Sequence, residues 1–357
     1  MRAGPEQKVS SRSSRADFSP QPEAAVASLA MAEKKKRETI EVDVEGRTLT
    51  LSNQSKVLYP AAAFTKGQVV DYYRRIAPVL VPHLKDRPLT LKRYPNGVDG
   101  MFFFEKNATK SRPEWVRTVP IYGYGRGEHL NFVLCDDTPT LVYVANLAAL
   151  ELHPSLSRSQ DLERPSMVVF DLDPGPPADL VTCCKAALVL REEFRRAGLQ
   201  AIAKTSGNKG MQLYVPLNTP TTYVDTKGWS RAIAEDLEAR YPDLFVSQMK
   251  KSIRDGKIFI DWSQNDFNKT TISVYSLRAR ERPTVSTPIS WEEIEQCERS
   301  KDKAPLVFEA PQVLERVAQQ GDLFAPALTL VQQLPDAPRV ATKSRSPRLK
   351  KQAPPPP

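Results

Sequence analysis

Short runs of alternating or apolar residues, separated by glycine, proline and polar residues, recur along most of this chain. Residues 40–44 alternate between apolar and polar side chains, and residues 47–51 repeat the alternation after Gly46, which predicts a hairpin of two strands. Apolar positions at helical spacing predict helices over residues 65–81, 178–197 and 229–241, and one or two more after Ser290. Further strands are expected at residues 88–94, 168–173, 201–204, 211–215, 257–262 and 272–277, with two more strands between residues 133 and 145.

The apolar run at residues 168–173 carries two aspartates and is ended by Pro174. Successive side chains of a strand point to opposite faces, so Asp171 and Asp173 share one face with their Cβ atoms roughly 6–7 Å apart. Two carboxylates at this spacing repel each other, and a divalent cation such as Mg²⁺ or Mn²⁺ between them would remove the repulsion. The alternative interpretation is a pair of acids on a solvated strand face or in a turn.

Two later segments favour the metal-binding interpretation. A second short apolar run carries a third acid, Asp261, near its end. Between the two acidic runs lies a polar loop, residues 204–210, in which Gly207 and Gly210 allow backbone amides to face an anion and Lys209 adds positive charge. A strand rather than a helix is expected after this loop, so it is not a P-loop. Three carboxylates and an anion-binding loop are the parts that two-metal nucleotidyl transfer requires.

Three other positions could contact a nucleotide or nucleic acid, and each also has a simpler explanation. Thr65 and Gln68 predict a capped helix start at which Lys66 would help to bind phosphate, or else an ordinary surface helix. Residues 102–104 are consecutive phenylalanines, which either leave an aromatic face exposed for base stacking or form a strand buried on both faces. His153 either touches substrate or is a buried histidine with its hydrogen bonds satisfied.

Composition favours a polyanionic partner and a reducing compartment. The chain carries a formal net charge of +9 with a pI near 9.3, although lysine and arginine near both ends supply part of this charge. The four cysteines show neither a disulfide framework nor a Cys-x-x-Cys metal spacing, which predicts a cytosolic location. No run approaches the roughly 18 apolar residues of a membrane span, so no membrane partner is expected.

The distribution of apolar residues predicts one domain, residues 39–333, between two tails. Residues 1–38 are rich in serine, arginine, proline and alanine, and residues 334–357 are rich in proline and lysine, so both are expected to be disordered. Met31 is a candidate for the true start of the protein, because ordered pattern begins soon after it.

Seven segments, in order, resemble the polymerase domain of bacterial ligase D, the DNA end-joining ligase, which belongs to the archaeo-eukaryotic primase superfamily. They are KVLYP at 56–60, TLKRYPNG at 90–97, ELHP at 151–154, VFDLDPG at 169–175, KTSG at 204–207, FIDW at 259–262 and YSLRAR at 275–280. The resemblance implies an α+β fold, in which mixed and antiparallel sheets flanked by helices form a primase-polymerase core. It also implies a template-directed DNA/RNA nucleotidyltransferase that fills gaps and extends DNA ends in double-strand break repair and that favours ribonucleotides.

The same resemblance implies roles for individual residues. The acids that hold two Mn²⁺ or Mg²⁺ ions match Asp171, Asp173 and Asp261. The positions that hold the incoming NTP or dNTP match His153, Ser206, Lys209, Gln212, Lys269 and Arg278. The positions that contact DNA match Lys56 and Lys66, at a downstream 5′-phosphate, and Lys92, Arg93, Phe103 and Phe104, on the template. The implied partners are DNA ends with a 5′-phosphate, Ku and a separate DNA ligase.

Two features bear on this resemblance. Gln212 stands where the family usually has histidine, and glutamine can donate a hydrogen bond to phosphate but cannot become cationic. Residues 253–256 lack the lysine of a nucleotidyl-ligase motif, so a polymerase without a ligase of its own is expected. Three alternatives stay open: a primase that makes primers de novo, a non-catalytic module that bridges DNA ends, and an Asp-x-Asp phosphohydrolase.

Overall fold

The computed structural model describes residues 38–123 and 129–336 of the chain. Contacts divide the chain into residues 1–38 and 39–357, and the helices and strands described below belong to the second unit. The tails expected to be disordered, 1–38 and 334–357, lie outside the described residues apart from residue 38 and residues 334–336. Their disorder, the domain bounds 39–333 and the start at Met31 therefore stay predictions.

The first elements of the domain form the predicted hairpin. Strands β1 (Thr39–Val44) and β2 (Arg47–Ser52) pair antiparallel, and Glu45 and Gly46 in the turn both have positive φ angles. Glycine is favoured at such a position because it has no Cβ to clash with the backbone. The short strands β3 (Val57–Tyr59) and β4 (Phe64–Thr65) follow.

Helix α1 (Lys66–Leu84) begins where the sequence predicted a helix start. The Thr65 side chain accepts a hydrogen bond from the Gln68 amide, and the Gln68 side chain accepts one from the Thr65 amide. This reciprocal pair is a capping box, which satisfies two amides that have no partner inside the helix. The side chains expected on the inner face of the helix are buried: Val69, Tyr72, Ile76 and Leu80.

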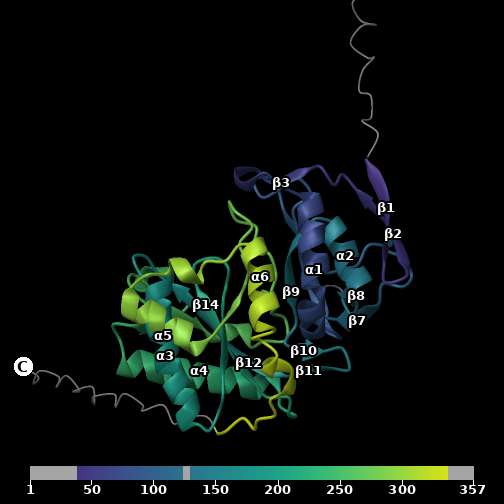
Figure 1. Cartoon of the computed structure of the whole chain (residues 1–357). Helices are drawn as coiled ribbons and strands as arrows, with labels where there is room; N and C mark the ends of the chain where they lie inside the picture. Colours follow the sequence, from purple (N-terminus) through teal and green to yellow (C-terminus); the bar gives the residue numbers. More distant parts are fainter. Residues whose placement is uncertain (1–37, 124–128, 337–357) are drawn as a thin grey trace, which may run out of the picture. The chain divides into compact units, whose positions relative to one another are not determined.

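A five-stranded antiparallel sheet forms the first half of the domain. Its strand order is β6-β5-β8-β7, with β9 also paired to β5. The strands are β5 (Pro88–Arg93), β6 (Phe103–Glu105), β7 (Thr118–Tyr122), β8 (His129–Leu134) and β9 (Ala149–Pro154). Helix α1 packs beside α2 (Thr138–Asn146) in this half (Figure 1).

Helix α2 stands where the sequence analysis expected the second of two strands, so that expectation was wrong. Asp137 caps the helix by accepting a hydrogen bond from the Thr140 amide, and Pro139 lies in the first turn, where an amide hydrogen is not needed. The valine, leucine and tyrosine residues of this segment favour strands by propensity. Burial of Leu141 and Val144 in the core shared with α1 outweighs that propensity.

A six-stranded sheet forms the second half, with strand order β15-β16-β12-β14-β13-β17. Only the β15–β16 pair of this described sheet is parallel. The strands are β12 (Met167–Pro174), β13 (Ile202–Thr205), β14 (Met211–Pro216), β15 (Phe245–Val246), β16 (Ile258–Asp261) and β17 (Pro288–Ile289). This mixture of mostly antiparallel sheets and helices confirms the α+β fold that the resemblance implied.

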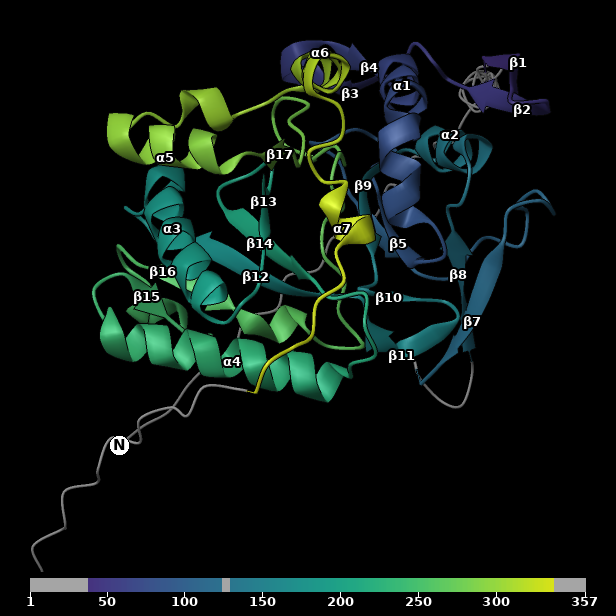
Figure 2. The same cartoon turned by 60° about the horizontal axis from the view of Figure 1, so that its bottom comes forward.

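The central strand β12 separates two cores. Its residues Val168, Phe170 and Leu172 pack into a core with α3 (Leu180–Arg196) and α4 (Tyr223–Arg240), while Val169 belongs to the core around α1. Figure 2 shows α3, α4 and α5 (Trp291–Ser300) gathered around the second sheet. The two aspartates of β12 alternate with the second core's residues, so they share the face of Val169.

Two further boundaries differ from the sequence analysis. Helix α4 begins at Tyr223 rather than at residue 229, because Thr222 forms a capping box with Asp225. Residues 272–277 do not form a strand, and Leu277 makes only an isolated bridge to Val285. The remaining elements are β10 (Ser157–Arg158), β11 (Asp161–Pro165), α6 (Ala310–Gln320), α7 (Pro326–Thr329) and the 3₁₀ turns η1 (Pro60–Ala62), η2 (Lys251–Ile253), η3 (Trp262–Gln264) and η4 (Ala304–Leu306).

Candidate active site

Three aspartates from two neighbouring strands lie at one end of the second sheet. In the pairing of β12 with β16, Asp171 stands directly opposite Asp261, and Asp173 follows two residues later on β12. Directly opposite residues in an antiparallel pair have Cβ atoms about 4.5–5.5 Å apart and project from the same face. The register thus brings Asp261 to the acid pair across a long stretch of sequence.

Burial, and after it repulsion, raises the pKa of two of these acids, Asp171 and Asp173. Burial, together with the charges of Asp173 and Asp261, raises the pKa of Asp171 to about 7. Burial and the charge of Asp261 likewise raise the pKa of Asp173. A divalent cation among these carboxylate oxygens would relieve the repulsion, so the chemistry of the donor set fits Mg²⁺ or Mn²⁺.

The Asp261 carboxylate already has hydrogen-bond partners in the η3 turn. Its Oδ1 accepts from the Ser263 amide at 3.1 Å and from Ser263 Oγ at 2.6 Å, and its Oδ2 accepts from Gln264 Nε2 at 2.7 Å. A carboxylate has about four lone-pair positions, so these bonds leave little room for another partner. Within residues 38–123 and 129–336, no three His, Cys, Asp or Glu side chains form a ready-made metal cluster. By the count of its bonds to η3, Asp261 has about one lone-pair position left for a metal ion while it keeps these bonds.

Gln212 and Lys204 continue the row of polar residues across the sheet. Gln212 pairs with Asp171 in the strand register, and Lys204 pairs with Gln212 on the next strand. Gln212 Oε1 accepts hydrogen bonds from Lys204 Nζ at 2.6 Å and from the Tyr214 hydroxyl at 3.2 Å. Two donors on this oxygen orient the Gln212 amide so that its nitrogen faces Asp171. The hydrogen bond from Gln212 to Asp171 lowers the pKa of Asp171, but the opposite effects of burial and of the neighbouring acids are larger. Gln212, predicted to bind nucleotide, thus also binds a catalytic candidate.

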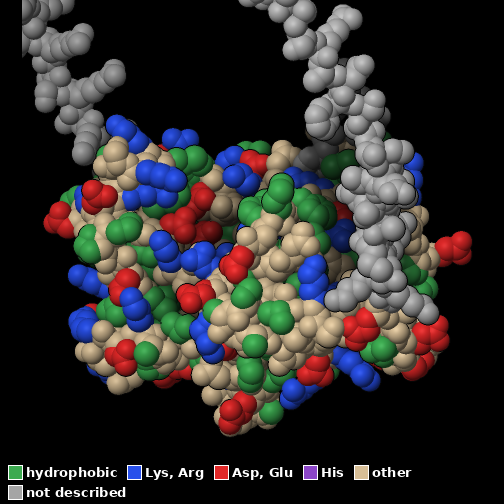
Figure 3. All heavy atoms as spheres, turned by 90° about the horizontal axis from the view of Figure 1, so that it is seen from above, with side chains coloured by type: hydrophobic (Ala, Val, Ile, Leu, Met, Phe, Trp, Pro, Cys, Tyr) green, Lys and Arg blue, Asp and Glu red, His purple; other side chains and the backbone are tan. Residues whose placement is uncertain are grey.

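A cleft of about 410 Å³ opens beside Asp171 and Asp173. Its basic lining residues are Lys209, Lys251, Arg254 and Arg278. Ser206 and Gln212 also line it, so most of the predicted nucleotide-binding positions meet there. Figure 3 shows acidic side chains beside a hollow of this surface, with lysine and arginine side chains around them. A cleft with this charge pattern suits a ligand that combines a metal ion with phosphates.

The glycine loop after β13 packs tightly against the rest of the site. Gly207 has a φ of +66°, and a Cβ at Gly210 would lie 2.2 Å from the carbonyl oxygen of Leu172. The amides of Asn208 and Gly210 donate to Ser206 Oγ at 3.3 and 3.2 Å. These two amides are therefore occupied within the loop, and anion binding by its other backbone amides stays a prediction.

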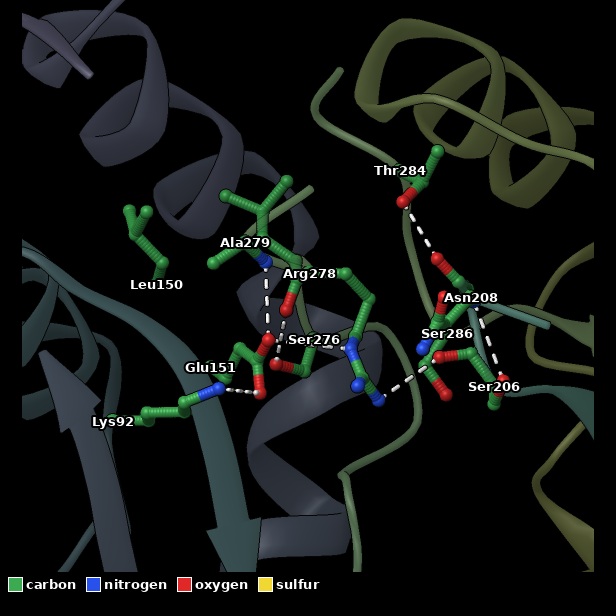
Figure 4. A network of polar contacts seen from close by, with 12 residues as sticks. Lys92, Leu150, Glu151, Ser206, Asn208, Ser276, Arg278, Ala279, Thr284 and Ser286 are labelled. Atoms are coloured by element: carbon green, nitrogen blue, oxygen red, sulfur yellow. Dashed lines mark hydrogen bonds and ion pairs between the residues drawn. The ribbon is translucent and has the colours of Figure 1, made fainter. Parts of the chain in front are cut away.

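Arg278 connects the cleft with a buried carboxylate that the sequence analysis did not assign. Its Nη1 donates to the carbonyl oxygen of Ser206 at 3.1 Å, and its Nε lies 3.4 Å from Glu151 Oε1 (Figure 4). Glu151 Oε2 lies 3.0 Å from His153 Nε2 and 3.7 Å from Lys92 Nζ. Three residues predicted to contact substrate thus share one carboxylate.

The predicted template-contacting residues lie on β5 and β6, where Phe103, Phe104 and the adjacent Phe102 form an exposed aromatic strip beside the partly buried Lys92 and Arg93. Phe102, Phe103 and Phe104 are 49%, 45% and 57% exposed, so the alternative of a strand buried on both faces was wrong. Lys92 Nζ lies 4.3 Å from the ring centre of Phe102, and the Arg93 guanidinium lies 5.1 Å from that of Phe103. Exposed rings beside cations suit base stacking along a nucleic-acid backbone.

The remaining predicted residues lie away from the cleft. Lys66 is buried, its Nζ donates to the carbonyl oxygen of Ser52 at 2.5 Å, and its backbone amide donates to the carbonyl oxygen of Lys56. Lys56 Nζ donates to the carbonyl oxygen of Pro95 at 2.6 Å. Lys269 is exposed and lies outside the described lining of the cleft. Binding of a 5′-phosphate by the two lysines and of nucleotide by Lys269 stays a prediction.

Two residues of the site, Glu151 and Lys204, carried no role in the sequence analysis. Glu151 and Lys204 belong to recognised segments, but a buried charge partner is not visible in one sequence. Lys251 and Arg254 belong to a basic run before β16, whose position beside the cleft depends on the β12–β16 pairing.

An acid-bearing, mostly antiparallel sheet beside a basic cleft is the arrangement expected of an α+β primase-polymerase domain. The model of a family described as "LigD, primase-polymerase domain" matches residues 65–324. The chain belongs to this family of LigD primase-polymerase domains.

Known relatives agree with this assignment. The multifunctional non-homologous end joining protein LigD of Mycolicibacterium smegmatis is 41% identical over 278 residues, which cover 77% of this chain and 35% of the relative. The bifunctional non-homologous end joining protein LigD of Bacillus subtilis is 32% identical over 277 residues, which cover 77% of this chain and 43% of the relative. The chain therefore spans less than half the length of either relative.

A solved structure has the same fold. It is the polymerase domain from Mycobacterium tuberculosis ligase D in complex with DNA, 37% identical, with a TM-score of 0.72. The match covers 78% of this chain and 97% of that chain. Among the described helices of the present chain, none is long and apolar enough to cross a membrane.

Proposed function

We propose that this chain is a metal-dependent nucleotidyltransferase that extends a DNA 3′ end opposite a template strand. The observation that carries the proposal is the register that sets Asp171 opposite Asp261 beside a basic cleft. Its family and the DNA-bound relative support a polymerase that acts on DNA. Preference for ribonucleotides, action on 5′-phosphorylated ends in double-strand break repair, a cytosolic location, and cooperation with Ku and a separate ligase belong to the same proposal.

Each part of the site has a role in this reaction. Asp171, Asp173 and Asp261 would hold two Mg²⁺ or Mn²⁺ ions, which when bound lower the pKa of a primer hydroxyl and neutralise a triphosphate. Lys209 and Arg278 line the cleft and would compensate negative charge on the phosphates. The exposed rings of residues 102–104 would stack on template bases.

Primer extension on a gapped duplex with a 5′-phosphate tests the proposal. With Mn²⁺ or Mg²⁺, we expect template-dependent addition that is faster with NTPs than with dNTPs. The double variant Asp171→Asn with Asp173→Asn should lose at least about a thousandfold in rate, since it removes charges that hold the ions. Its DNA affinity in a gel-shift assay should stay near that of the wild type. Extension by this variant at the wild-type rate would contradict the assignment.

A non-catalytic module that bridges DNA ends is the second candidate. The hydrogen bonds of Asp261 to η3 favour it, because they engage the third acid without a metal. In that case the wild-type chain would join labelled DNA ends in a pull-down assay but would show no extension with any nucleotide or metal.

A further inference from the structure

Glu151 is a buried carboxylate beside the cleft that the roles above leave unassigned. It lies on β9 opposite Lys92 of β5 and is 2% exposed. Its Oε1 faces the Ala279 amide at 3.1 Å and Arg278 Nε at 3.4 Å, and Lys92 Nζ lies 3.7 Å from its Oε2 (Figure 4). The same Oε2 lies 3.0 Å from His153 Nε2. Because it is buried and both oxygens are engaged, Glu151 is not placed to touch a substrate.

The basic partners of Glu151 reach different parts of the site. Arg278 lines the cleft and bonds the carbonyl oxygen of Ser206 in the glycine loop. The His153 ring lies edge-on to Phe104, with 6.2 Å between ring centres. Lys92 lies over the ring of Phe102 at 4.3 Å. One carboxylate therefore connects the nucleotide cleft with the aromatic strip.

We propose that Glu151 is a positioning residue that holds Arg278, His153 and Lys92 in place before substrate binds, and so couples the nucleotide side of the site to its template side. The inference rests on the proposed function, which assigns Arg278 to the triphosphate and Lys92 to the template. Long basic side chains lose rotamer freedom when they bind phosphate, and a partner that orders them beforehand reduces this loss. Glu151 supplies that partner from within the protein.

The variant Glu151→Gln tests the charge at constant size. Its amide oxygen can still accept from the Ala279 amide, but it no longer attracts the three basic side chains. We expect the KM for the incoming nucleotide to rise about tenfold, the affinity for template DNA to fall about threefold, and kcat to change by less than about threefold. In a double-mutant cycle with Arg278→Gln, the two effects on KM should be far from additive, because both remove one interaction.

Two measurements do not depend on catalysis. Calorimetry with ATP should show weaker binding to Glu151→Gln than to the wild type. In NMR titrations, the pKa of His153 should be lower in the variant than in the wild type. In the wild type, burial lowers this pKa and Glu151 raises it, and the variant loses the second effect. Unchanged ATP affinity together with unchanged His153 titration would overturn the inference.

A matched control separates positioning from stability. Asp322 is another largely buried carboxylate bonded to a histidine, His83 Nε2 at 2.8 Å, and it lies outside the lining of the cleft. Asp322→Asn should lower thermal stability without changing KM or ATP affinity. Equal effects of Glu151→Gln and Asp322→Asn on KM would overturn the inference. Additive effects of Glu151→Gln and Arg278→Gln on KM would overturn it as well. If Glu151→Gln does not fold, Glu151→Asp, which keeps the charge but shortens its reach, should give an intermediate KM, and a wild-type KM would count against positioning.

The proposed function can fail separately from this inference. If the wild-type chain extends no primer but Glu151→Gln still weakens ATP binding and shifts His153, the polymerase assignment fails and the positioning role stands. If the wild type extends primers and Glu151→Gln matches it in KM and ATP affinity, the polymerase assignment stands and the positioning role fails.

Discussion

At the scale of single residues, two buried charges near the cleft have opposite surroundings. Burial raises the pKa of Glu151, but the hydrogen bond from His153 and the charges of Arg278 and Lys92 outweigh burial, so the pKa falls to about 2. Lys204 donates to the neutral acceptors Gln212 and Ser286, and burial lowers its pKa well below the usual range. The protein thus stabilises the Glu151 charge and destabilises the Lys204 charge.

Glu151 should make stability depend on pH in the acid range. Its pKa is about 2 when folded against a usual value of 4.5, so the unfolded chain takes up this proton first. Its contribution is therefore complete above about pH 4.5 and is lost as the pH falls toward 2. Urea unfolding at about pH 5 and pH 3 measures this effect. Between these two pH values, the free energy of unfolding of Glu151→Gln should fall by roughly 1–2 kcal/mol less than that of the wild type. An equal fall in the free energy of unfolding of both proteins would contradict the lowered pKa of Glu151.

Replacement of Lys204 should affect the acids more than the fold. Lys204→Met keeps a similar length and removes a poorly solvated ammonium, so the melting temperature should change by less than about 3 °C. The Gln212 amide loses one of the donors that orient it, and Asp171 loses a nearby positive charge. Extension activity should fall about tenfold. A control variant, Lys85→Met on the surface, should keep wild-type activity.

At the scale of elements, the site depends on how closely the glycine loop approaches β12. A Cβ at Gly210 would lie 2.2 Å from the Leu172 carbonyl oxygen, which belongs to the strand that carries the acids. Gly228 lies in α4, and a Cβ there would meet no described atom within 4 Å. Gly210 is therefore required for close packing of the loop on β12, whereas no neighbouring atom requires a glycine at position 228.

These two glycines should respond oppositely to alanine. Gly210→Ala should push the loop from β12, lower stability by about 1–3 kcal/mol and reduce extension at least tenfold. Gly228→Ala should raise stability by about 0.5–1 kcal/mol, because alanine is the better helix former, and should leave activity unchanged. Thermal unfolding and primer extension measure both effects. A stable, active Gly210→Ala variant would show that the loop tolerates displacement.

At the scale of the whole domain, the segment after α6 connects the two cores. The Asp322 carboxylate accepts from the Tyr275 hydroxyl at 2.7 Å and lies 2.8 Å from His83 Nε2 of α1. Ten residues of chain later, the Gln332 amide donates to the carbonyl oxygen of Leu217 at 2.8 Å, just beyond β14. The segment thus contacts α1 at one end and the second sheet at the other.

Asp322→Asn should weaken this connection. The variant removes a charge that His83 and Tyr275 bond, so stability should fall by about 1–3 kcal/mol. Calorimetric unfolding should then show a lower transition temperature. An unchanged transition would indicate that the segment contributes little to the domain's stability.

Sequence patterns predicted the elements whose causes are local. The capping box of Thr65 and Gln68, the turn at Gly46 and the shared face of Asp171 and Asp173 each depend on neighbours in the chain. Helix α2 was missed because its strand-favouring residues form a helix only when they pack in the core with α1. The resemblance placed Asp261 with the acid pair, but its hydrogen bonds to η3 could not be predicted, because they depend on side-chain geometry.

By itself, the sequence determined which side chains have chemistry suited to metal, phosphate or bases and which of them share a strand face, because residue type and strand alternation settle both. Only the tertiary structure decided which of them meet. It set Asp261 opposite Asp171, placed Lys66 in a buried bond to Ser52, and surrounded Glu151 with three basic side chains. The physical reason is that strand register and charge burial depend on partners far apart in the chain, and their energies appear only when the sheets and helices pack together.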